Sequence, residues 1–386
     1  MMMFRPALQS MMARGFAVRA AYNSNPKARQ PVRQVYKPAS PLDKFKLNVD
    51  DVQSVPFEKI EGLSKETAVM FKERGFENAF PVQAASFRPV YEGDNIIVKE
   101  KTGSGKTIAY ALPIIERLRK QKKLGDYTSK GPKVIVLVPT RELCMQVYGE
   151  IDKLQISAGE FSTVPVFGGV NFGSQAQNLR RGSDIVVATP GRLADHIDKQ
   201  SIDLSNVEAI IMDETDEMLN IGFKVQIQEI IETIKSSSGG SKDIQFLLFS
   251  ATIPDWVSKD AVSFMGNNFK FIDMVSSSSQ ETPMNTQHIK LLVQNNDEAK
   301  GLISTLINKY AKNRGRCIVF TETKYEAKDL AKNNQIIGDV RQLHGDVDQA
   351  DRIKTFNDFK NGIANIIVAT NVAARGLDFP NVDLVI

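Results

Sequence analysis

The sequence predicts an α/β protein of two domains, each built on a parallel sheet. Short β-branched runs alternate with helical stretches, and such runs are typical of strands that are buried on both faces. This alternation is interrupted once, by residues 273–287, which contain four consecutive serines and a proline, and it then restarts. The chain of 386 residues is long enough for about two to three domains.

The composition agrees with a folded protein and excludes several other classes. Hydrophobic residues make up 42% and charged residues 24%, which is close to the average of globular domains. No apolar run approaches the ~18–20 residues that span a bilayer, so we expect no membrane partner. The two cysteines, Cys144 and Cys317, lie far apart, which excludes a disulfide framework and a CxxC zinc site.

Residues 1–42 differ from the rest of the chain in charge. They hold seven basic residues and no acidic one, whereas the remainder holds 42 basic and 45 acidic residues, a net charge of −3. An acid-free segment rich in Arg, Ala and Met is typical of a transit peptide, so we expect import into the mitochondrial matrix, with residues 23–42 as an unstructured spacer. The alternatives are a disordered basic tail that contacts RNA, and a location in the nucleolus or nucleus. Because the body is not basic, RNA binding has to come from local motifs.

We expect the first domain at residues 43–275, a linker at 276–285 and the second domain at 286–386. The strands expected in the first domain are Asn95–Lys99, Lys133–Val138, Asp184–Thr189, Ala209–Asp213 and Gln245–Ser250. Those expected in the second are Lys290–Val293, Arg316–Thr321, Val340–His344, Ala364–Thr370 and Val382–Ile386. Ligands of open α/β sheets bind at the carboxyl ends of strands, so the segments that follow these runs are the candidates for the site.

The segment after the first strand is a phosphate-binding loop, Lys101-Thr102-Gly103-Ser104-Gly105-Lys106-Thr107. Its glycines let backbone N–H groups close around phosphate oxygens, and the start of the following helix adds a partial positive charge. Lys106 would reach the β- and γ-phosphates, and the Thr107 hydroxyl would bind Mg²⁺. Glu100 stands where the general pattern has a small residue. A carboxylate beside a triphosphate is repulsive unless it points away or pairs with a cation such as Lys99 or Lys101.

Three acids follow the fourth strand of the first domain. Asp213 is positioned to hold Mg²⁺ through water, and Glu214 to orient or deprotonate the attacking water. Asp216 is the expected switch partner of the segment Ser250-Ala251-Thr252, which ends the next strand. The pairing of a phosphate loop with this acidic motif favours nucleotide hydrolysis, with a nucleotide and Mg²⁺ as the expected ligands.

Other strands end in further motifs: Pro139-Thr140-Arg141-Glu142-Leu143, Gly168-Gly169, Thr189-Pro190-Gly191-Arg192 and the segment Thr370–Asp378. In order and spacing, the whole set resembles the DEAD-box RNA helicases of superfamily 2, from about residue 57 to the end, and within them most the nucleolar RNA helicase II/Gu branch. The acidic motif here reads Asp-Glu-Thr-Asp. The resemblance implies two RecA-like domains of the P-loop NTPase type. It also implies an ATP-hydrolysing RNA helicase that binds ATP and RNA between them and unwinds short duplexes or remodels RNA–protein complexes.

The resemblance also assigns roles to residues. The catalytic residues would be Lys106, Asp213, Glu214, Ser250 and Thr252, with Thr107 and Asp213 as the Mg²⁺ ligands. Phe57 would stack on the adenine and Gln83 would bond its edge, while Asp378 would contact the ribose. Contacts to the RNA backbone are implied for Pro139, Thr140, Arg141, Gly168, Gly169, Thr189, Gly191, Arg192, Gln349, Arg352, Thr370 and Gly376. Gripping phosphates in this way needs no large basic patch and reads little sequence.

The chain ends at Ile386, before the arginine motif with which members of this family clamp the γ-phosphate. We therefore expect an incomplete second domain, whether the chain is a fragment or a natural truncation. The alternative function is a catalytically weak RNA-binding clamp or RNA chaperone. A metabolic P-loop kinase would not account for a second domain with the Thr370–Asp378 motif.

Overall fold

The computed structural model describes most of the chain after residue 41. The described residues are 42, 45–49, 52–101, 103–128, 131–157, 159–237, 243–253, 255–275, 286–293, 295–311, 315–332, 336, 338–371, 379 and 381–386. The predicted transit peptide and spacer (except Leu42), the linker 276–285, Thr102, Gly376 and Asp378 lie outside them, so the domain bounds remain a prediction.

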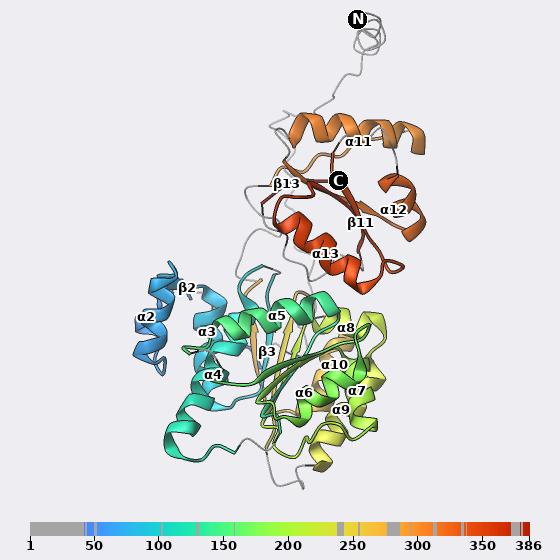
Figure 1. The fold of residues 1–386 in the computed structure, drawn as a ribbon. Coiled ribbons are helices and arrows are strands. Elements are labelled where there is room, and N and C mark those ends of the chain that lie inside the picture. The colour runs from blue at the N-terminus through green and yellow to red at the C-terminus, as the bar shows by residue number, and fades with distance from the viewer. Residues whose placement is uncertain are drawn as a thin grey trace, which may run out of the picture. The chain divides into compact units, whose positions relative to one another are not determined.

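The first domain alternates strands and helices from its start (Figure 1). Its elements are β1 (Val55–Pro56), η2 (Phe57–Lys59), α2 (Lys65–Glu73), β2 (Asn78–Ala79), α3 (Pro81–Glu92), β3 (Ile96–Lys99), α4 (Lys106–Leu124), β4 (Val134–Leu137), α5 (Arg141–Lys153), β5 (Thr163–Val166), α6 (Phe172–Arg180), β6 (Ile185–Ala188), α7 (Pro190–Asp198), β7 (Ala209–Asp213), α8 (Thr215–Ile221), α9 (Lys224–Ser237), β8 (Gln245–Ser250), α10 (Asp255–Met265) and β9 (Lys270–Asp273).

The main sheet of this domain has seven parallel strands in the order β5-β6-β4-β7-β8-β3-β9. All five strands predicted for this domain are present, each within one residue of its predicted ends. The sheet also holds β5 and β9, which were not predicted and which form its two edges. A separate antiparallel pair, β1 and β2, precedes it.

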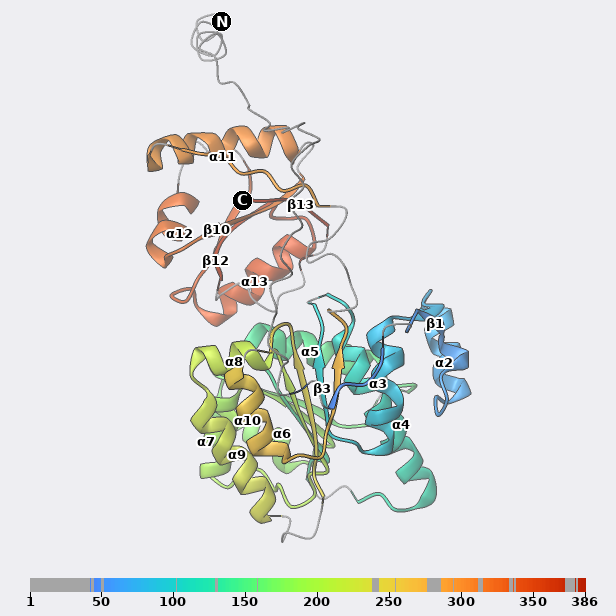
Figure 2. The same ribbon diagram turned by 180° about the vertical axis from the view of Figure 1, so that it is seen from behind.

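The core of this domain lies on both faces of the sheet because successive side chains of a strand point to opposite sides. On β3, Ile96 and Val98 pack into one hydrophobic cluster with α3, α4 and α5, and Ile97 packs into another with α6 to α10. Figures 1 and 2 show α3 and α4 to one side of the sheet and α7, α9 and α10 to the other. This double burial explains the continuous apolar runs from which the strands were predicted.

The second sheet has four parallel strands in the order β11-β12-β10-β13. The elements of this part are α11 (Asn296–Tyr310), β10 (Arg316–Thr321), α12 (Lys324–Ala331), β11 (Val340–Leu343), α13 (Gln349–Lys360), β12 (Ile366–Thr370) and β13 (Val382–Val385). Helices α11 and α12 pack on one face and α13 on the other. The α/β fold with two parallel sheets is thus confirmed.

One predicted strand of the second domain is wrong. Residues 286–293 form no strand in the structure, and Leu292 is 89% exposed. The apolar run Leu291-Leu292-Val293 satisfies the side-chain requirement of a buried strand. However, a strand also needs a hydrogen-bonded neighbour, and no described strand pairs with this segment.

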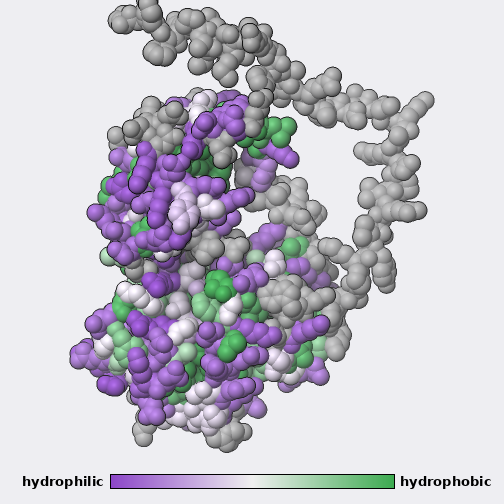
Figure 3. All heavy atoms as spheres, turned by 90° about the vertical axis from the view of Figure 1, so that its right-hand side faces the viewer, coloured by the Kyte–Doolittle hydropathy of each residue, from purple (hydrophilic) through white to green (hydrophobic). Residues whose placement is uncertain are grey.

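Hydrophilic side chains cover most of the described surface on the face drawn in Figure 3, with single hydrophobic ones between them. Scattered apolar side chains of this kind are normal on a folded protein. Within the described ranges, no helix combines the length and the apolar character that a membrane span requires.

The segment 133–208 begins just before β4 and ends just before β7, and its first and last residues lie side by side. The backbone N–H of Glu208 donates to the carbonyl of Lys133 at 2.8 Å, and the two side chains form an ion pair of 2.8 Å. Lys133 is buried, and the Glu208 carboxylate also accepts a hydrogen bond of 2.9 Å from Gln121. The two ends of the segment 133–208 are therefore fastened to each other.

Candidate functional site

The phosphate loop lies between the end of β3 and the start of α4, as predicted. Gly103 and Gly105 have φ values of 76° and 85°, in the left-handed region where a side chain is strained. A Cβ atom on Gly105 would also lie 2.4 Å from Nε2 of Gln83, so only glycine fits this position. The backbone of the loop therefore depends on its glycines.

Lys106 begins α4 and is buried, with 7% of its surface exposed. Its ammonium donates to the carbonyl oxygens of Glu100 at 3.2 Å and Lys101 at 3.3 Å. These neutral acceptors hold the lysine inside the loop. An arriving phosphate would offer it an ionised acceptor, so that both partners of the hydrogen bond would carry opposite charges.

Gln83 lies beside the phosphate loop. Its Nε2 donates to the carbonyl of Gly105 at 3.2 Å, and its Oε1 accepts the backbone N–H of Phe80 at 2.9 Å. Phe80 precedes α3, its side chain is 53% exposed, and its ring edge would lie 3.0 Å from a Cβ atom on Gly105. Phe80 was not among the nucleotide contacts predicted from the sequence. The sequence offered one indication of its role, since Phe80 is an aromatic residue three positions before Gln83.

Phe57, the predicted base-stacking residue, is placed differently. Only 3% of it is exposed, and its ring stacks on that of Phe71 with centroids 4.0 Å apart and an angle of 4° between the planes. In this structure the ring belongs to the hydrophobic core and is not open to a base. Sequence position alone could not show this, because the covering residue comes from α2.

Asp213 ends β7 and is 3% exposed. Its Oδ2 accepts the phenolic O–H of Tyr110 at 3.0 Å, and its Oδ1 accepts the backbone N–H of Glu214 at 2.9 Å. Burial raises the pKa of Asp213, while the nearby Lys106 ammonium opposes the shift. A further positive charge at this position would stabilise the ionised carboxylate.

Glu214 adopts a left-handed backbone conformation, with φ at 52°. This conformation costs a residue other than glycine about 1–2 kcal/mol. Strain of this kind is found at functional sites, where the surrounding structure holds the residue in place. It sets Glu214 at the junction of β7 and α8, between the two acids Asp213 and Asp216.

Asp216 is hydrogen-bonded to the segment after β8, so the predicted contact between these two motifs is confirmed. Its Oδ2 accepts the N–H of Thr252 at 3.1 Å and the hydroxyl of Thr252 at 2.6 Å. Its backbone N–H donates to the buried hydroxyl of Ser250 at 3.2 Å. These bonds tie the acidic motif to the end of the neighbouring strand.

The predicted RNA-contact residues of the first domain gather on the loops after β4, β5 and β6. The Arg141 guanidinium starts α5 and lies against Gly168, whose hypothetical Cβ would be 3.2 Å from it. Gly169 follows with φ at 83°. Pro139 is buried, and the Thr140 hydroxyl oxygen caps α5 by accepting the N–H of Leu143 at 3.2 Å.

The loop after β6 is fastened to the same place. Arg192 donates from Nε to the carbonyl of Phe167 at 3.2 Å and also bonds the carbonyl of Val170. Thr189 is 8% exposed and precedes α7, and no atom lies within 4 Å of a Cβ built on Gly191. Three loops distant in sequence are thus brought together by arginine side chains.

The strand order puts the predicted RNA contacts and the predicted nucleotide contacts of the first domain side by side at the carboxyl ends of the strands. Strands β5, β6 and β4 carry the predicted RNA-contact loops, while β7, β8 and β3 carry the acids, Ser250 and the phosphate loop. All the strands are parallel, so all these loops follow carboxyl ends.

In the second domain the described members of the predicted set also follow or adjoin the sheet. Thr370 is the last residue of β12 and pairs with Thr321 of β10 in the sheet register. Gln349 starts α13, and Arg352 lies in the first turn of that helix.

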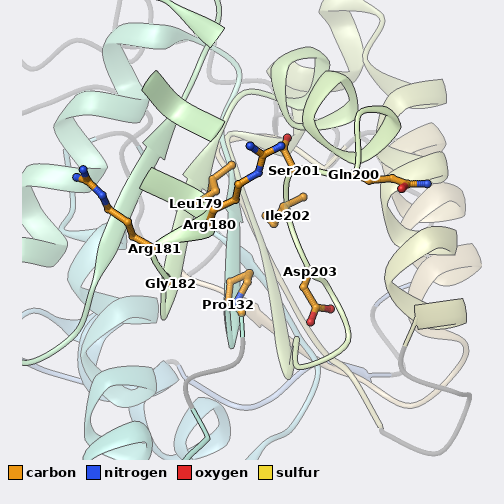
Figure 4. Close-up of a pocket in the computed structure, with 10 residues that line it drawn as sticks. Pro132, Leu179, Arg180, Arg181, Gly182, Gln200, Ser201, Ile202 and Asp203 are labelled. Atoms are coloured by element: carbon orange, nitrogen blue, oxygen red, sulfur yellow. The ribbon is translucent and has the colours of Figure 1, made fainter. Parts of the chain in front are cut away.

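A cavity of about 400 Å³ lies at the opposite ends of the strands of the first sheet (Figure 4). Pro132 and Gly182, which line it, precede the starts of β4 and β6, so the cavity is at the amino ends of the strands. Arg180 and Asp203 also line it. None of the predicted site residues belongs to this cavity.

Both cysteines are buried free thiols, and burial raises the pKa of each to about 12. No cluster of three or more His, Cys, Asp or Glu residues suited to a metal occurs in the part of the chain that the structure describes.

Two family models match the chain in succession. A model described as DEAD/DEAH box helicase matches residues 80–260, and one described as helicase conserved C-terminal domain matches residues 298–386. The crystal structure of a DEAD box protein from Methanococcus jannaschii is 30% identical, with 86% of this chain and 85% of that chain covered and a TM-score of 0.50.

The chain belongs to the DEAD-box helicase family. The nucleolar RNA helicase 2 of Rattus norvegicus is 37% identical over 343 residues, which cover 86% of this chain and 43% of the relative. The structure of Mss116p bound to single-stranded RNA and AMP-PNP has a TM-score of 0.73 at 27% identity, over 86% of this chain and 68% of that chain. The chain thus spans less than half the length of the nucleolar relative that it matches.

These findings confirm the predicted family, including the likeness to nucleolar RNA helicase II. They also confirm the two RecA-like domains expected of a DEAD-box protein.

Proposed function

We propose that this DEAD-box protein is an ATP-dependent RNA helicase that hydrolyses ATP and remodels short RNA duplexes or RNA–protein complexes. The observation that supports this most is that both sets of proposed contacts follow the carboxyl ends of strands in one sheet. The phosphate loop and acidic motif follow β3 and β7, and the loops joined by Arg141 and Arg192 follow the adjacent strands β4 to β6. Mss116p, which shares the fold, was solved with RNA and an ATP analogue.

In this proposal Lys106 binds the nucleotide phosphates and Glu214 orients and deprotonates the attacking water. Phe80 supplies the stacking surface for the base, because its ring is exposed beside Gly105 and Gln83 whereas Phe57 is buried. Ser250 and Thr252 are both hydrogen-bonded to Asp216, so a movement of their segment would also move the acidic motif. Thr102 and Asp378 are proposed nucleotide contacts from the sequence alone.

Thr107 and Asp213 are the proposed Mg²⁺ ligands. The Asp213 carboxylate is buried, its pKa is raised by burial, and its neighbour Tyr110 also interacts with Thr107. Such a site suits Mg²⁺, which proteins hold through one or two side chains together with substrate phosphates and water. The bound ion would offset negative charge on the phosphates and on Asp213.

RNA is bound mainly through its backbone. Backbone N–H groups, hydroxyls and a few arginines can hold phosphates without reading bases, which agrees with a body of net charge −3. The proposed contacts are the residues of the loops after β4, β5 and β6, together with Gln349, Arg352, Thr370 and Gly376.

We also propose import into mitochondria. This proposal is based on the composition of residues 1–42, with seven basic and no acidic residues. The name of the rat relative points instead to the nucleolus. A fluorescent protein fused after residue 42 should enter mitochondria, and exchanging Arg5, Arg14 and Arg19 for Glu should keep it in the cytosol. Nucleolar fluorescence of the unmodified fusion would contradict the proposal.

Hydrolysis is tested with the longest chain that the gene encodes, by measuring ATP turnover with and without single-stranded RNA. Lys106→Ala should lose ATP binding, because it removes the counter-charge of the phosphates. Glu214→Gln should keep ATP and RNA binding but lose at least about 100-fold in turnover, because an amide cannot act as a base.

Glu232→Gln serves as the control, since this exposed acid lies on α9, which carries none of the proposed site residues, and the exchange changes the charge by the same amount. Equal loss of ATP affinity in the Lys106 and Glu214 variants would contradict the assigned roles. Binding of ATP and RNA without turnover in the unchanged protein would favour the RNA-binding clamp over the helicase.

A further inference from the structure

Glu100 is the only acid in the loop segment 100–107. It directly follows β3 and stands where the general phosphate-loop pattern has a small residue. A carboxylate at this position is unexpected, since the neighbouring groups are those that have to receive a triphosphate. The surroundings of Glu100 show what the carboxylate does in the ligand-free loop.

The side chain of Glu100 binds the loop itself. Its Oε1 accepts the backbone N–H of Lys101 at 2.8 Å, which is one of the donors of the loop. The backbone of Glu100 is fixed as well, because its N–H donates to the carbonyl of Ser250 at 3.0 Å and its carbonyl accepts from Lys106 at 3.2 Å. The carboxylate is therefore hydrogen-bonded to the backbone of the loop.

The charges near Glu100 act on its carboxylate in opposite directions. Lys99 forms an ion pair of 3.5 Å with Asp273, so Lys99 is engaged with a different acid. Burial raises the pKa of Glu100, and the neighbouring Asp273 adds to this shift, whereas the hydrogen bond from the Lys101 backbone and the charges of Lys106 and Lys101 oppose it. Glu100 is half-buried, so solvent screens its charge less than that of an exposed acid.

We propose that the Glu100 carboxylate is an internal competitor for the nucleotide phosphates and thereby sets the affinity of the loop for ATP. In the free protein it occupies the N–H of Lys101 and lies in the field of Lys106, which are groups that a phosphate needs. ATP has to displace it and then binds near a negative charge. The penalty grows with the number of phosphates, so Glu100 disfavours ATP more than ADP and does not affect adenosine. This inference rests on the proposed ATP site.

The inference is tested by calorimetric titration of the full chain with adenosine, ADP and ATP in the presence of Mg²⁺. Glu100→Gln removes the charge and retains an oxygen that can accept the Lys101 N–H, while Glu100→Ala removes both. We expect ATP affinity to rise about three- to tenfold in both variants, with a smaller rise for ADP and none for adenosine. Glu232→Gln, with the same charge change on α9, should bind all three ligands as the unchanged chain does.

The outcomes separate this inference from the proposed function. If the unchanged chain binds ATP and neither Glu100 variant binds it more tightly, the role of Glu100 is wrong and the proposed function stands. An equal gain for adenosine would also overturn it, because the effect would then not arise from phosphate charge. If no form of the chain binds ATP, both the inference and the proposed function fail.

Discussion

At the scale of single residues, burial separates two aromatic rings that the sequence could not distinguish. Phe57 and Phe80 are both aromatic residues that precede Gln83 in the sequence, and only Phe57 was predicted to stack on a base. The sequence does not show which of the two rings is covered. The stacking of Phe57 on Phe71 puts it in the core, whereas Phe80 is 53% exposed beside Gly105.

Exchange of each ring for alanine should therefore have opposite consequences. Phe80→Ala should weaken ATP binding by about 1–3 kcal/mol, the usual contribution of base stacking, and leave the unfolding free energy almost unchanged. Phe57→Ala should lower the unfolding free energy by about 3–5 kcal/mol, because it opens a cavity in the core. Nucleotide titration and urea unfolding measure the two quantities, and weaker ATP binding in a stably folded Phe57 variant alone would contradict the assignment.

His196 on α7 is a buried residue whose protonation should affect stability. It is 0% exposed, its Nδ1 lies 2.7 Å from the Ser201 hydroxyl, and its ring stacks on Phe172. Burial, with smaller contributions from Arg192 and Lys199 against Asp195, lowers its pKa from 6.5 to about 4. The folded state thus binds the proton less readily than the unfolded state does.

The sign of the pH dependence follows from this difference. Between pH 6.5 and about 4 the unfolded chain takes up a proton that the folded chain refuses, so the unfolding free energy falls as the pH falls. The loss attributable to His196 between pH 7 and pH 4.5 should be about 2–3 kcal/mol. Urea unfolding at both pH values should show a correspondingly smaller loss in His196→Asn. An equal loss in both proteins would contradict a neutral buried imidazole.

At the scale of elements, the interior strands could be predicted and the edges could not. Strands β3, β4, β6, β7 and β8 are covered on both faces, and their apolar runs record this directly. Edge strand β5 contains Pro165, and its residues alternate between buried and half-buried. Edge strand β9 begins with Lys270 and ends with Asp273, so only two apolar residues stand between them. Neither strand produces a continuous run.

The candidate site could also be predicted only in part. Because the motifs directly follow buried strands, their position at the carboxyl edge could be predicted, and so could the contact of Asp216 with Thr252. The internal ligands of the phosphate loop could not, since the hydrogen bonds of Lys106 with loop carbonyls depend on the path of the backbone. The sequence left open whether the Glu100 carboxylate points away or pairs with a cation, and in the structure it accepts the backbone N–H of Lys101.

The ion pair that joins the starts of β4 and β7 should stabilise the first sheet. The side chain of Lys133 is 3% exposed and that of Glu208 22%, so the exchange Lys133→Met leaves a partly buried acid without this cation. We expect the unfolding free energy to fall by about 2 kcal/mol, the range for a hydrogen bond to a charged group.

The exposed pair Lys153–Glu150, with side chains 64% and 36% exposed, provides the matched control. Lys153→Met should change stability by no more than about 0.5 kcal/mol. Urea unfolding measures both effects. Similar values for the two variants would mean that burial of the Lys133 pair is unimportant.

At the scale of the whole molecule, the two sheets have separate hydrophobic cores. The clusters around the first sheet and those around the second share no residue among the buried side chains that the structure describes. Ile211 on β7 and Ile367 on β12 are 1% and 0% exposed, and each lies in the middle of its own sheet. A substitution that destabilises one sheet should therefore leave the stability of the other sheet unchanged.

Hydrogen exchange measured peptide by peptide tests this separation. Ile211→Ala and Ile367→Ala should each destabilise one sheet by about 2–5 kcal/mol. The first should speed exchange in β4, β7 and β8 only, and the second in β10, β11 and β12 only. Faster exchange in both sheets of either variant would show that the two cores unfold as one unit.

The junction between Lys133 and Glu208 also bears on how this molecule could be re-engineered. All the proposed RNA contacts of the first domain lie in the stretch between these two residues, while the phosphate loop, the acids and Ser250 lie outside it. The stretch enters and leaves at adjacent hydrogen-bonded positions, so its two ends need no extra chain to meet. The stretch is still joined to the rest of the domain, because its strand β4 pairs with β7 and its apolar side chains share both hydrophobic clusters. Transplanting the corresponding stretch from a relative should therefore exchange the proposed RNA contacts and leave the proposed nucleotide contacts in place only where these packing residues are kept.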